Sequence, residues 1–298
     1  VKDKVIEFET GNVLIGSVSR LYMSNKCLLI ADHKSVDKQI HIFNKNDFSY
    51  LTSIGNFGEG PEEITVMGCL AIDEAHHQLY VSDHAKQKIF SYDMDSVMVD
   101  SLYKPQVKTA MNETLFPSEY QYINDTLSIA VLIKPTSTST FNQFLGRWNM
   151  NTGEMIPMKY THPDIQKKRI TFAASEKAGI YVECYTRHDL MTICSLDGEL
   201  LYNIYGPDWD GGNGNKLQSF GTVMIGNDKI FVSYCGEDYA RDSFPTKILV
   251  FDLEGNYLKT LETGYKISDC CYDSFNNRII LSLNDVVQFA YLDIDGII

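Results

Sequence analysis

Six short apolar runs of one pattern recur along this 298-residue chain, and their spacing is nearly constant. The first residues of consecutive runs lie 48 to 53 positions apart, so the repeats fill most of the chain. A repeat of this length is typical of arrays in which each unit buries its apolar face against a neighbour. The runs are Cys27–Asp32, Gln78–Asp83, Thr126–Val131, Gly179–Cys184, Lys229–Tyr234 and Arg278–Leu283.

Each run lies among segments of the same kind. A strand such as Leu70–Asp73 precedes the run, a strand such as Ile248–Asp252 follows it, and a fourth such as Tyr257–Leu261 leads away. Period-two patterning with short polar turns indicates antiparallel strands, and four strands per repeat are typical of a propeller blade. The sequence therefore predicts an all-β, six-bladed β-propeller with four-stranded blades, in a single domain. The predicted blades lie at about 18–55, 66–103, 119–160, 169–206, 219–262 and 266–296 of residues 1–298.

The two ends of the chain complement each other. The last repeat supplies three strands, and Lys4–Glu9 is a spare alternating strand near the N-terminus. We expect this strand, within residues 1–10, to pair into the last blade and close the ring, because an unpaired edge exposes N–H and C=O groups. The alternative is a last blade of three strands. Helix is expected only as a short turn at Pro163–Arg169.

The second repeat resembles an NHL repeat. Gly55–Pro61 matches the G-x-x-G-x-G-P turn of that family, and Leu79–Asp83 and Ile89–Asp93 match two of its strands. The chain as a whole is similar to six-bladed NHL and TolB-like propellers, which include exported and often lipid-anchored bacterial proteins. Looser copies of the repeat cover residues 27–55, 179–207 and 229–264, and the region 120–160 departs most from it.

The resemblance implies an extracytoplasmic binding domain, periplasmic or at the cell surface, and it carries over no catalytic residue. The printed sequence begins at Val1 without an initiator methionine. We therefore expect that an export signal has been removed. The sequence does not show whether a lipid anchor preceded Val1, and it leaves a cytoplasmic location open. No apolar run is as long as a transmembrane helix.

The net charge and the spacing of the cysteines exclude some kinds of partner and site. Acidic residues outnumber basic ones, 39 to 26, and the net charge of −13 repels nucleic acid. The seven cysteines include no C-x-x-C pair, so neither a zinc ribbon nor a thioredoxin-like site is expected. Cys184 and Cys194 are predicted to face each other across a hairpin, as free thiols or, less favoured, as a disulfide. Six closed blades need no partner for stability, so we expect a monomer.

The sequence lacks the common short catalytic motifs G-x-S-x-G, H-E-x-x-H, Walker A and G-x-G-x-x-G. In a propeller, the ends of the second strands, the starts of the first strands and the blade-to-blade connections share one face. We expect ligands on that face, around the central channel. The ligand-binding candidates there are Arg20, Asp32, His33, Asp83, His84, Lys134, Arg169, Arg187, His188, Trp209, Glu237, Asp238 and Lys266.

An Asp–His pair follows the repeated run in the first two blades, as Asp32–His33 and Asp83–His84. A carboxylate beside an imidazole suits a metal ligand or an acid–base pair. An aspartate in this position also caps a turn by accepting backbone N–H bonds, and we favour this interpretation. His76 and His77 fall in another turn, and no third ligand lies near them in the sequence, so zinc is not expected there.

The predicted face also carries five basic residues of an otherwise acidic chain. The planar guanidinium of arginine donates two parallel bonds to a carboxylate or phosphate. This cluster predicts binding of an anionic glycan, a peptide carboxylate or an acidic protein, although each charge taken singly also suits a solvated strand end. The basic residues are Arg20, Lys134, Arg169, Arg187 and Lys266.

The leading hypothesis is a non-enzymatic recognition propeller that binds a protein, peptide or glycan and needs no cofactor. The alternative is a hydrolase or lyase with a calcium or zinc ion in the central channel, held first by Asp32 and Asp83. A third hypothesis is sugar binding, in which Trp209 and Tyr205 stack on sugar rings.

Overall fold

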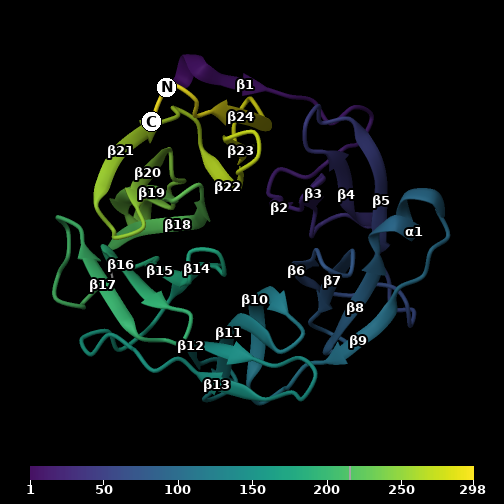
Figure 1. The fold of residues 1–298 in the computed structure, drawn as a ribbon, viewed down its shortest axis with the longest axis horizontal. Helices are drawn as coiled ribbons and strands as arrows, with labels where there is room; N and C mark the ends of the chain where they lie inside the picture. The colour runs from purple at the N-terminus through teal and green to yellow at the C-terminus, as the bar shows by residue number, and fades with distance from the viewer. Residues whose placement is uncertain (215) are drawn as a thin grey trace. The chain divides into compact units, whose positions relative to one another are not determined.

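The computed structural model describes residues 1–214 and 216–298, and its strands form six four-stranded antiparallel sheets (Figure 1). Each sheet takes its strands from one repeat in chain order, apart from one strand of the last sheet. These sheets are the blades of a six-bladed β-propeller, which confirms the predicted fold class. The chain divides into two compact units with three blades each, namely residues 10–158 (the first-half unit) and residues 1–9 with 159–298 (the second-half unit). The single-domain organisation expected from the sequence stays a prediction.

The first-half unit contains blades 1 to 3, and one short helix, α1 (Met94–Val99), joins the last two strands of blade 2. Its strands are β2 (Arg20–Met23), β3 (Cys27–Ala31), β4 (Lys38–Asn44) and β5 (Tyr50–Asn56) in blade 1, β6 (Met67–Asp73), β7 (Gln78–Asp83), β8 (Lys88–Asp93) and β9 (Gln106–Ala110) in blade 2, and β10 (Phe116–Asn124), β11 (Leu127–Pro135), β12 (Phe141–Trp148) and β13 (Met155–Pro157) in blade 3.

The second-half unit contains blades 4 to 6 and two single-turn 3-10 helices, η1 (Lys2–Lys4) and η2 (Tyr239–Arg241). Its strands are β14 (Ile170–Ser175), β15 (Ile180–Tyr185), β16 (Leu190–Ser195) and β17 (Leu200–Tyr205) in blade 4, β18 (Leu217–Gly226), β19 (Lys229–Asp238), β20 (Lys247–Asp252) and β21 (Tyr257–Glu262) in blade 5, and β22 (Ile267–Asp273), β23 (Arg278–Leu283), β24 (Phe289–Asp293) and β1 (Val5–Glu7) in blade 6.

The N-terminal strand completes the last blade. β1 pairs antiparallel with β24, with Ile6 opposite Tyr291. The N-terminal ammonium of Val1 donates to the carbonyl oxygen of Glu262 at 2.9 Å, which fixes the start of the chain against blade 5. This pairing gives blade 6 its fourth strand and covers the edge of β24, so the prediction of a pairing N-terminal strand is confirmed.

Helix forms at a different place from the one predicted. α1 begins after Asp93, whose carboxylate accepts from the Asp95 N–H and from the Ser96 hydroxyl, so a side-chain cap stabilises its first turn. The insertion moves the fourth strand of blade 2 past residue 103, where the blade was expected to end. The segment Pro163–Arg169 is an irregular turn instead of a helix.

The cores lie between consecutive blades of each unit. Every residue of β3 and of β15 is buried, which explains why the repeated runs are mostly apolar rather than alternating. Leu29 of blade 1 and Val81 of blade 2 belong to one cluster, and Val182 of blade 4 and Val232 of blade 5 belong to another. Stacking of the blades within each unit is therefore what buries the repeats.

The cysteines pack as apolar residues. All seven are buried and free, and burial raises the pKa of the Cys69 thiol to about 11. The expected placement of Cys184 opposite Cys194 is wrong, because the register of β15 and β16 pairs Cys184 with Met191 and Cys194 with Tyr181. Within the residues that the structure describes, no helix has the length and apolar character needed to cross a membrane.

Candidate functional site

The aspartate of the second Asp–His pair anchors the connection that enters its blade. Asp83 ends β7 with a fully buried side chain. Its carboxylate accepts from the backbone N–H groups of Thr65 and Val66, at 2.8 and 3.2 Å, which precede β6. It also accepts from those of Ala85 and Lys86, at 3.0 and 3.2 Å, in the turn that follows. One side chain thus joins two loops.

Asp32 plays the corresponding part in blade 1. Its buried carboxylate accepts from the Gly16 N–H at 2.8 Å and from the Lys34 N–H at 3.1 Å. The turn interpretation therefore describes the contacts of both aspartates. Neither belongs to the three-residue group of metal-ligating side chains that is found among the described residues.

The two histidines of these pairs meet at Gly68 in β6. His33 donates from Nε2 to the Gly68 carbonyl oxygen at 3.1 Å. A Cβ atom at position 68 would lie 2.1 Å from Nε2 of His84, so the close approach of this ring requires glycine. The His84 ring packs edge-to-face on Phe116, with centroids 4.7 Å apart, and burial lowers the pKa of His84. His33 is therefore held by a hydrogen bond and His84 by ring packing, while both residues are partly exposed.

The predicted basic residues of the first-half unit contribute little to an anion site. The Arg20 guanidinium pairs with the Glu119 carboxylate and lies 5.4 Å from the centroid of the Tyr22 ring. Lys134 is exposed on β11. Because Arg20 is already held by a carboxylate, it is less available to an external anion.

The second-half unit contains a pocket of about 840 Å³ with walls from blades 4, 5 and 6. Two of the predicted basic residues line it, together with the predicted His188. The pocket is also lined by polar residues that were not predicted from the sequence. The charged and aromatic lining residues that carry the argument are Lys167, Arg169, Arg187, His188, Tyr239 and Asp242.

Strand pairing brings the two arginines together. Arg169 precedes β14 and Arg187 follows β15, and the register pairs Ile170 with Tyr185, so both arginines lie at the same end of this hairpin. Arg169 donates from Nη1 to the Lys168 carbonyl oxygen at 2.7 Å. Burial and the charge of Arg187 both lower the pKa of Arg169, although an arginine remains protonated. Two guanidinium charges therefore face one cavity.

Tyr239 supports the second guanidinium. The Arg187 Cζ atom lies 3.3 Å from the centroid of the Tyr239 ring, in η2 after β19. Cation–π stacking of this kind holds the planar guanidinium without using its hydrogen-bond donors. This stacking holds the Arg187 guanidinium at the pocket wall.

The remaining predicted residues lie around this pocket without lining it. Glu237 pairs with Arg241, with 3.2 Å between Oε2 and Nη1, and Asp238 caps η2 by accepting from the Ala240 N–H. Lys266 is exposed directly before the lining residue Ile267, and its backbone N–H donates to Asp285. Glu237 and Asp238 therefore stabilise the local structure through contacts with η2.

Trp209 belongs to a group of packed rings beside the pocket. Its ring centroid lies 5.0 Å from that of Tyr205, 5.4 Å from His162 and 6.1 Å from His188. His188 is 5% exposed, and burial lowers its pKa. Its Nδ1 atom is buried without a hydrogen-bond partner in the part of the chain that the structure describes, and it is covered by Gly214. The indole therefore supports the pocket wall at His188.

Sequence reasoning missed a buried ion pair in blade 4. Lys168 donates to the Glu183 carboxylate at 2.7 Å, and their side chains are only 10% and 2% exposed. Tyr185 donates to the other oxygen of Glu183 at 3.2 Å. The available signal was a glutamate inside the apolar run Gly179–Cys184, since a charge in a buried strand needs a partner. Tyr239 and His162 gave no comparable signal, because only folding brings them to the site.

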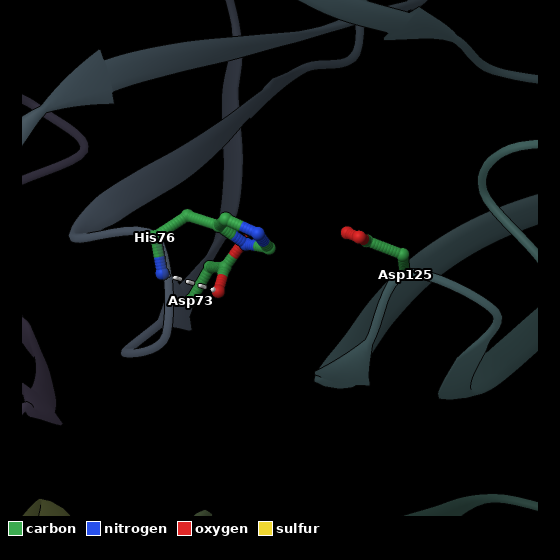
Figure 2. Close-up of side chains that lie close together, drawn as sticks. All are labelled: Asp73, His76 and Asp125. Atoms are coloured by element: carbon green, nitrogen blue, oxygen red, sulfur yellow. Dashed lines mark hydrogen bonds and ion pairs between the residues drawn. The ribbon is translucent and has the colours of Figure 1, made fainter.

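His76, which the sequence left without a third ligand, lies beside two carboxylates in the first-half unit (Figure 2). Asp73 comes from the end of β6, and Asp125 comes from the turn between β10 and β11. One ligand atom from each of the three residues lies within 4.8 Å of the other two. This is the one group of three or more potential metal ligands within residues 1–214 and 216–298.

Comparison with known proteins supports the fold. The family model DUF5128, described as a 6-bladed beta-propeller, matches residues 4–144. A DUF4221 family member from Bacteroides vulgatus ATCC 8482 is similar in structure, with a TM-score of 0.62 and 9% identity over 97% of this chain and 95% of that one. A candidate exported protein from Bacteroides fragilis NCTC 9343 has a TM-score of 0.58 and 14% identity over 93% of this chain and 82% of that one. No curated protein matches the sequence.

Proposed function

We propose that this protein is a non-enzymatic recognition propeller that binds an anionic group of a peptide, protein or glycan in the pocket of its second-half unit. The observation that carries the proposal is the pairing of Arg169 and Arg187 in one cavity wall. Bringing two like charges together raises the energy of the unbound protein, and a bound carboxylate would relieve that repulsion.

The other walls of the pocket suit the same ligand. Gln218, Thr222 and Ser233 offer amide and hydroxyl groups, while Asp242 is a single acidic residue among the lining groups. A cavity volume of about 840 Å³ is within the range of sites that enclose a small molecule or the end of a longer chain. The net charge of −13 repels anions from the protein as a whole, so binding of an anion would depend on local contacts with the two arginines.

The metal-dependent hydrolase or lyase has less support as a function based on Asp32 and Asp83. Their carboxylate oxygens accept backbone N–H bonds from the loops that enter the blades. Neither aspartate belongs to the group of three potential metal ligands found among the described residues. We therefore place recognition first and propose that the protein acts outside the cytoplasm, like the candidate exported protein with a similar fold.

The test is direct binding of charged and uncharged probes to the purified protein by isothermal titration calorimetry. The probes are oligogalacturonate, an oligoglutamate peptide and a neutral glucan oligosaccharide of similar length. We expect one acidic probe to bind and the neutral one to fail. The substitution Arg187→Gln should weaken binding by about tenfold to a hundredfold, because an ionic hydrogen bond contributes ~1.5–3 kcal/mol.

The matched control is Arg241→Gln, which makes the same chemical change at an exposed arginine that does not line the pocket. Its affinity should equal that of the parent protein. The proposal fails if Arg187→Gln and Arg241→Gln behave alike, or if neither acidic probe binds at millimolar concentration.

A further inference from the structure

We propose that Asp73, His76 and Asp125 form a binding site for a divalent transition-metal cation, with zinc as the preferred ion. This site lies in the first-half unit and is independent of the anion pocket. Two carboxylates and one imidazole would supply three protein ligands, which leaves the fourth position of a tetrahedral zinc ion to water.

Different segments bring the three side chains together. Asp73 is the last residue of β6 and is buried, and His76 lies in the turn that leads to β7 with an exposed side chain. Asp125 belongs to the next blade and is partly buried. Figure 2 shows the Asp125 carboxylate directed toward the other two residues across the gap between their turns. An ion would therefore have its ligands on two blades and an open approach at His76.

Two tyrosines donate hydrogen bonds to the two carboxylates. Tyr80 donates its hydroxyl to Oδ2 of Asp73 at 2.7 Å, and Tyr122 donates to Oδ1 of Asp125 at 2.5 Å. The two tyrosine rings pack edge-to-face with centroids 5.2 Å apart. Hydrogen bonds from outer groups are what fix the direction of ligating carboxylates in metal sites.

The turn after β22 in blade 6 is equivalent to the turn after β6 in blade 2, and the two differ in their side chains. There Asp273 ends β22, and its carboxylate accepts from the Asn276 N–H at 3.2 Å and from the Asn276 amide at 2.7 Å. In blade 2, Asp73 accepts from the backbone and ring of His76 at 3.2 and 2.8 Å. The turn is thus the same, with an imidazole in place of an amide.

The charges beside the two turns differ. In blade 6, Arg278 forms an ion pair with Asp273, with 3.4 Å between Nε and Oδ2. The corresponding residue in blade 2 is Gln78, whose amide donates to the His76 carbonyl oxygen. Blade 2 therefore has a neutral amide where blade 6 has a permanent cation, and Asp125 lies beside its turn. This change of charge favours an external cation.

The donor set selects the kind of cation. Carboxylates alone suit calcium or magnesium, whereas an imidazole shifts the preference toward zinc and other transition metals. Lys108, whose ammonium lies 5.3 Å from the centroid of the Tyr80 ring, adds positive charge behind the site. We therefore expect moderate rather than very tight binding.

Blade 6 also supplies the variants for the test. His76→Asn reproduces the capping residue of the blade 6 turn and removes the imidazole. His77→Asn makes the same change one residue later, where blade 6 has Asn277 in the same left-handed conformation, with φ of 52° at His77 and 50° at Asn277. Asp125→Asn removes the third ligand while it keeps an oxygen that can accept from Tyr122.

Metal-stripped protein is titrated with zinc and, separately, with magnesium in a calorimeter, and its melting temperature is measured with and without zinc. We expect one zinc ion per chain in the parent protein and in His77→Asn, at least tenfold weaker binding in His76→Asn and Asp125→Asn, and weaker binding of magnesium. Zinc should raise the melting temperature only in the two proteins that bind it.

Retention of the fold is checked by the circular dichroism and melting temperature of each metal-free variant. If His76→Asn unfolds, Asp125→Asn alone decides the outcome, because its side chain is partly exposed and keeps its tyrosine contact. Equal zinc affinity in the parent and Asp125→Asn would overturn the site. So would the absence of a zinc signal at millimolar concentration.

Discussion

Asp83 in the first-half unit and Asp189 in the second-half unit are both buried aspartates that hold a loop, yet their pKa values shift in opposite directions. Their exposed fractions are 0% and 3%. Asp83 accepts from four backbone N–H groups and lies 3.4 Å from the ammonium of Lys86. Asp189 accepts from the Asp208 N–H at 2.9 Å and from the Tyr234 hydroxyl at 3.2 Å.

The pKa values of Asp83 and Asp189 differ because the two carboxylates have different numbers of hydrogen-bond donors. Burial raises the pKa of Asp83, but the backbone donors of Thr65, Val66 and Lys86, together with the Lys86 charge, lower it below its ordinary value. Burial also raises the pKa of Asp189, and the donors there do not compensate, so its pKa stays raised. Equal burial therefore does not imply the same direction of pKa shift. The supply of N–H donors decides whether a buried carboxylate stabilises the fold.

The largest expected effect is that of Asp83→Asn. An amide cannot accept all the bonds that the carboxylate accepts, and Lys86 loses its counter-ion in a setting where its side chain is 18% exposed. We expect the free energy of unfolding at pH 7 to fall by ~3 kcal/mol, as for other buried charged hydrogen-bond partners. Chemical denaturation monitored by tryptophan fluorescence measures it. A loss below about 0.5 kcal/mol would mean that water replaces these contacts.

The same variant gives a defined pH dependence. The pKa of Asp83 is lower in the folded than in the unfolded protein, so its contribution is complete above the ordinary aspartate value of about 4. That contribution disappears as the pH falls through the lowered folded pKa. The stability difference between the parent and Asp83→Asn should therefore be constant from pH 5 to 7 and should shrink in the acid range.

Asp189→Asn should have a smaller effect of opposite sign. The pKa of Asp189 is raised in the folded protein, so the protonated form suits the fold and ionisation at neutral pH costs stability. The amide resembles the protonated carboxyl, and we expect it to stabilise the protein by about 1 kcal/mol at pH 7. The gain should fade as the pH falls toward 4. Destabilisation at pH 7 would show that the carboxylate is needed by Asp208 and Tyr234.

Lys86→Gln should have the smallest effect. It separates the contribution of the ion pair from that of the N–H donors at Asp83. The Lys86 ammonium donates to the Glu63 carbonyl oxygen at 2.5 Å and to the Thr65 hydroxyl at 3.1 Å, besides its ion pair with Asp83. A glutamine amide can keep one of these bonds, so we expect a loss of ~0.5–1 kcal/mol by thermal denaturation. A loss as large as that of Asp83→Asn would assign the stabilisation to the ion pair instead of the N–H donors.

The repeat was readable because local patterns and blade positions agree. The stretch Cys27–Ala31 is apolar throughout because its strand is buried on both faces. The spare strand near the N-terminus could be matched to a blade short of one strand. The helix α1 was not predicted, because six residues with one buried apolar side chain, Val97, show no helical periodicity.

The candidate sites were predictable only in part. The sequence selected Arg169, Arg187 and His188, and strand register places them at the same pocket. It also grouped Arg20 with them, although Arg20 pairs with Glu119. The partner that decides how an arginine behaves is remote in sequence, and neither spacing nor composition identifies it.

The sequence by itself determined the number of blades, most of their strands and the pairing of the N-terminal strand, because these depend on short-range patterns repeated six times. Only the tertiary structure decided which charged groups meet. Asp125 lies close to Asp73 and His76, and Tyr239 lies beneath Arg187, because separate blades and loops pack together. Electrostatic character depends on distances of a few ångströms between such segments, and that information is absent from any single repeat.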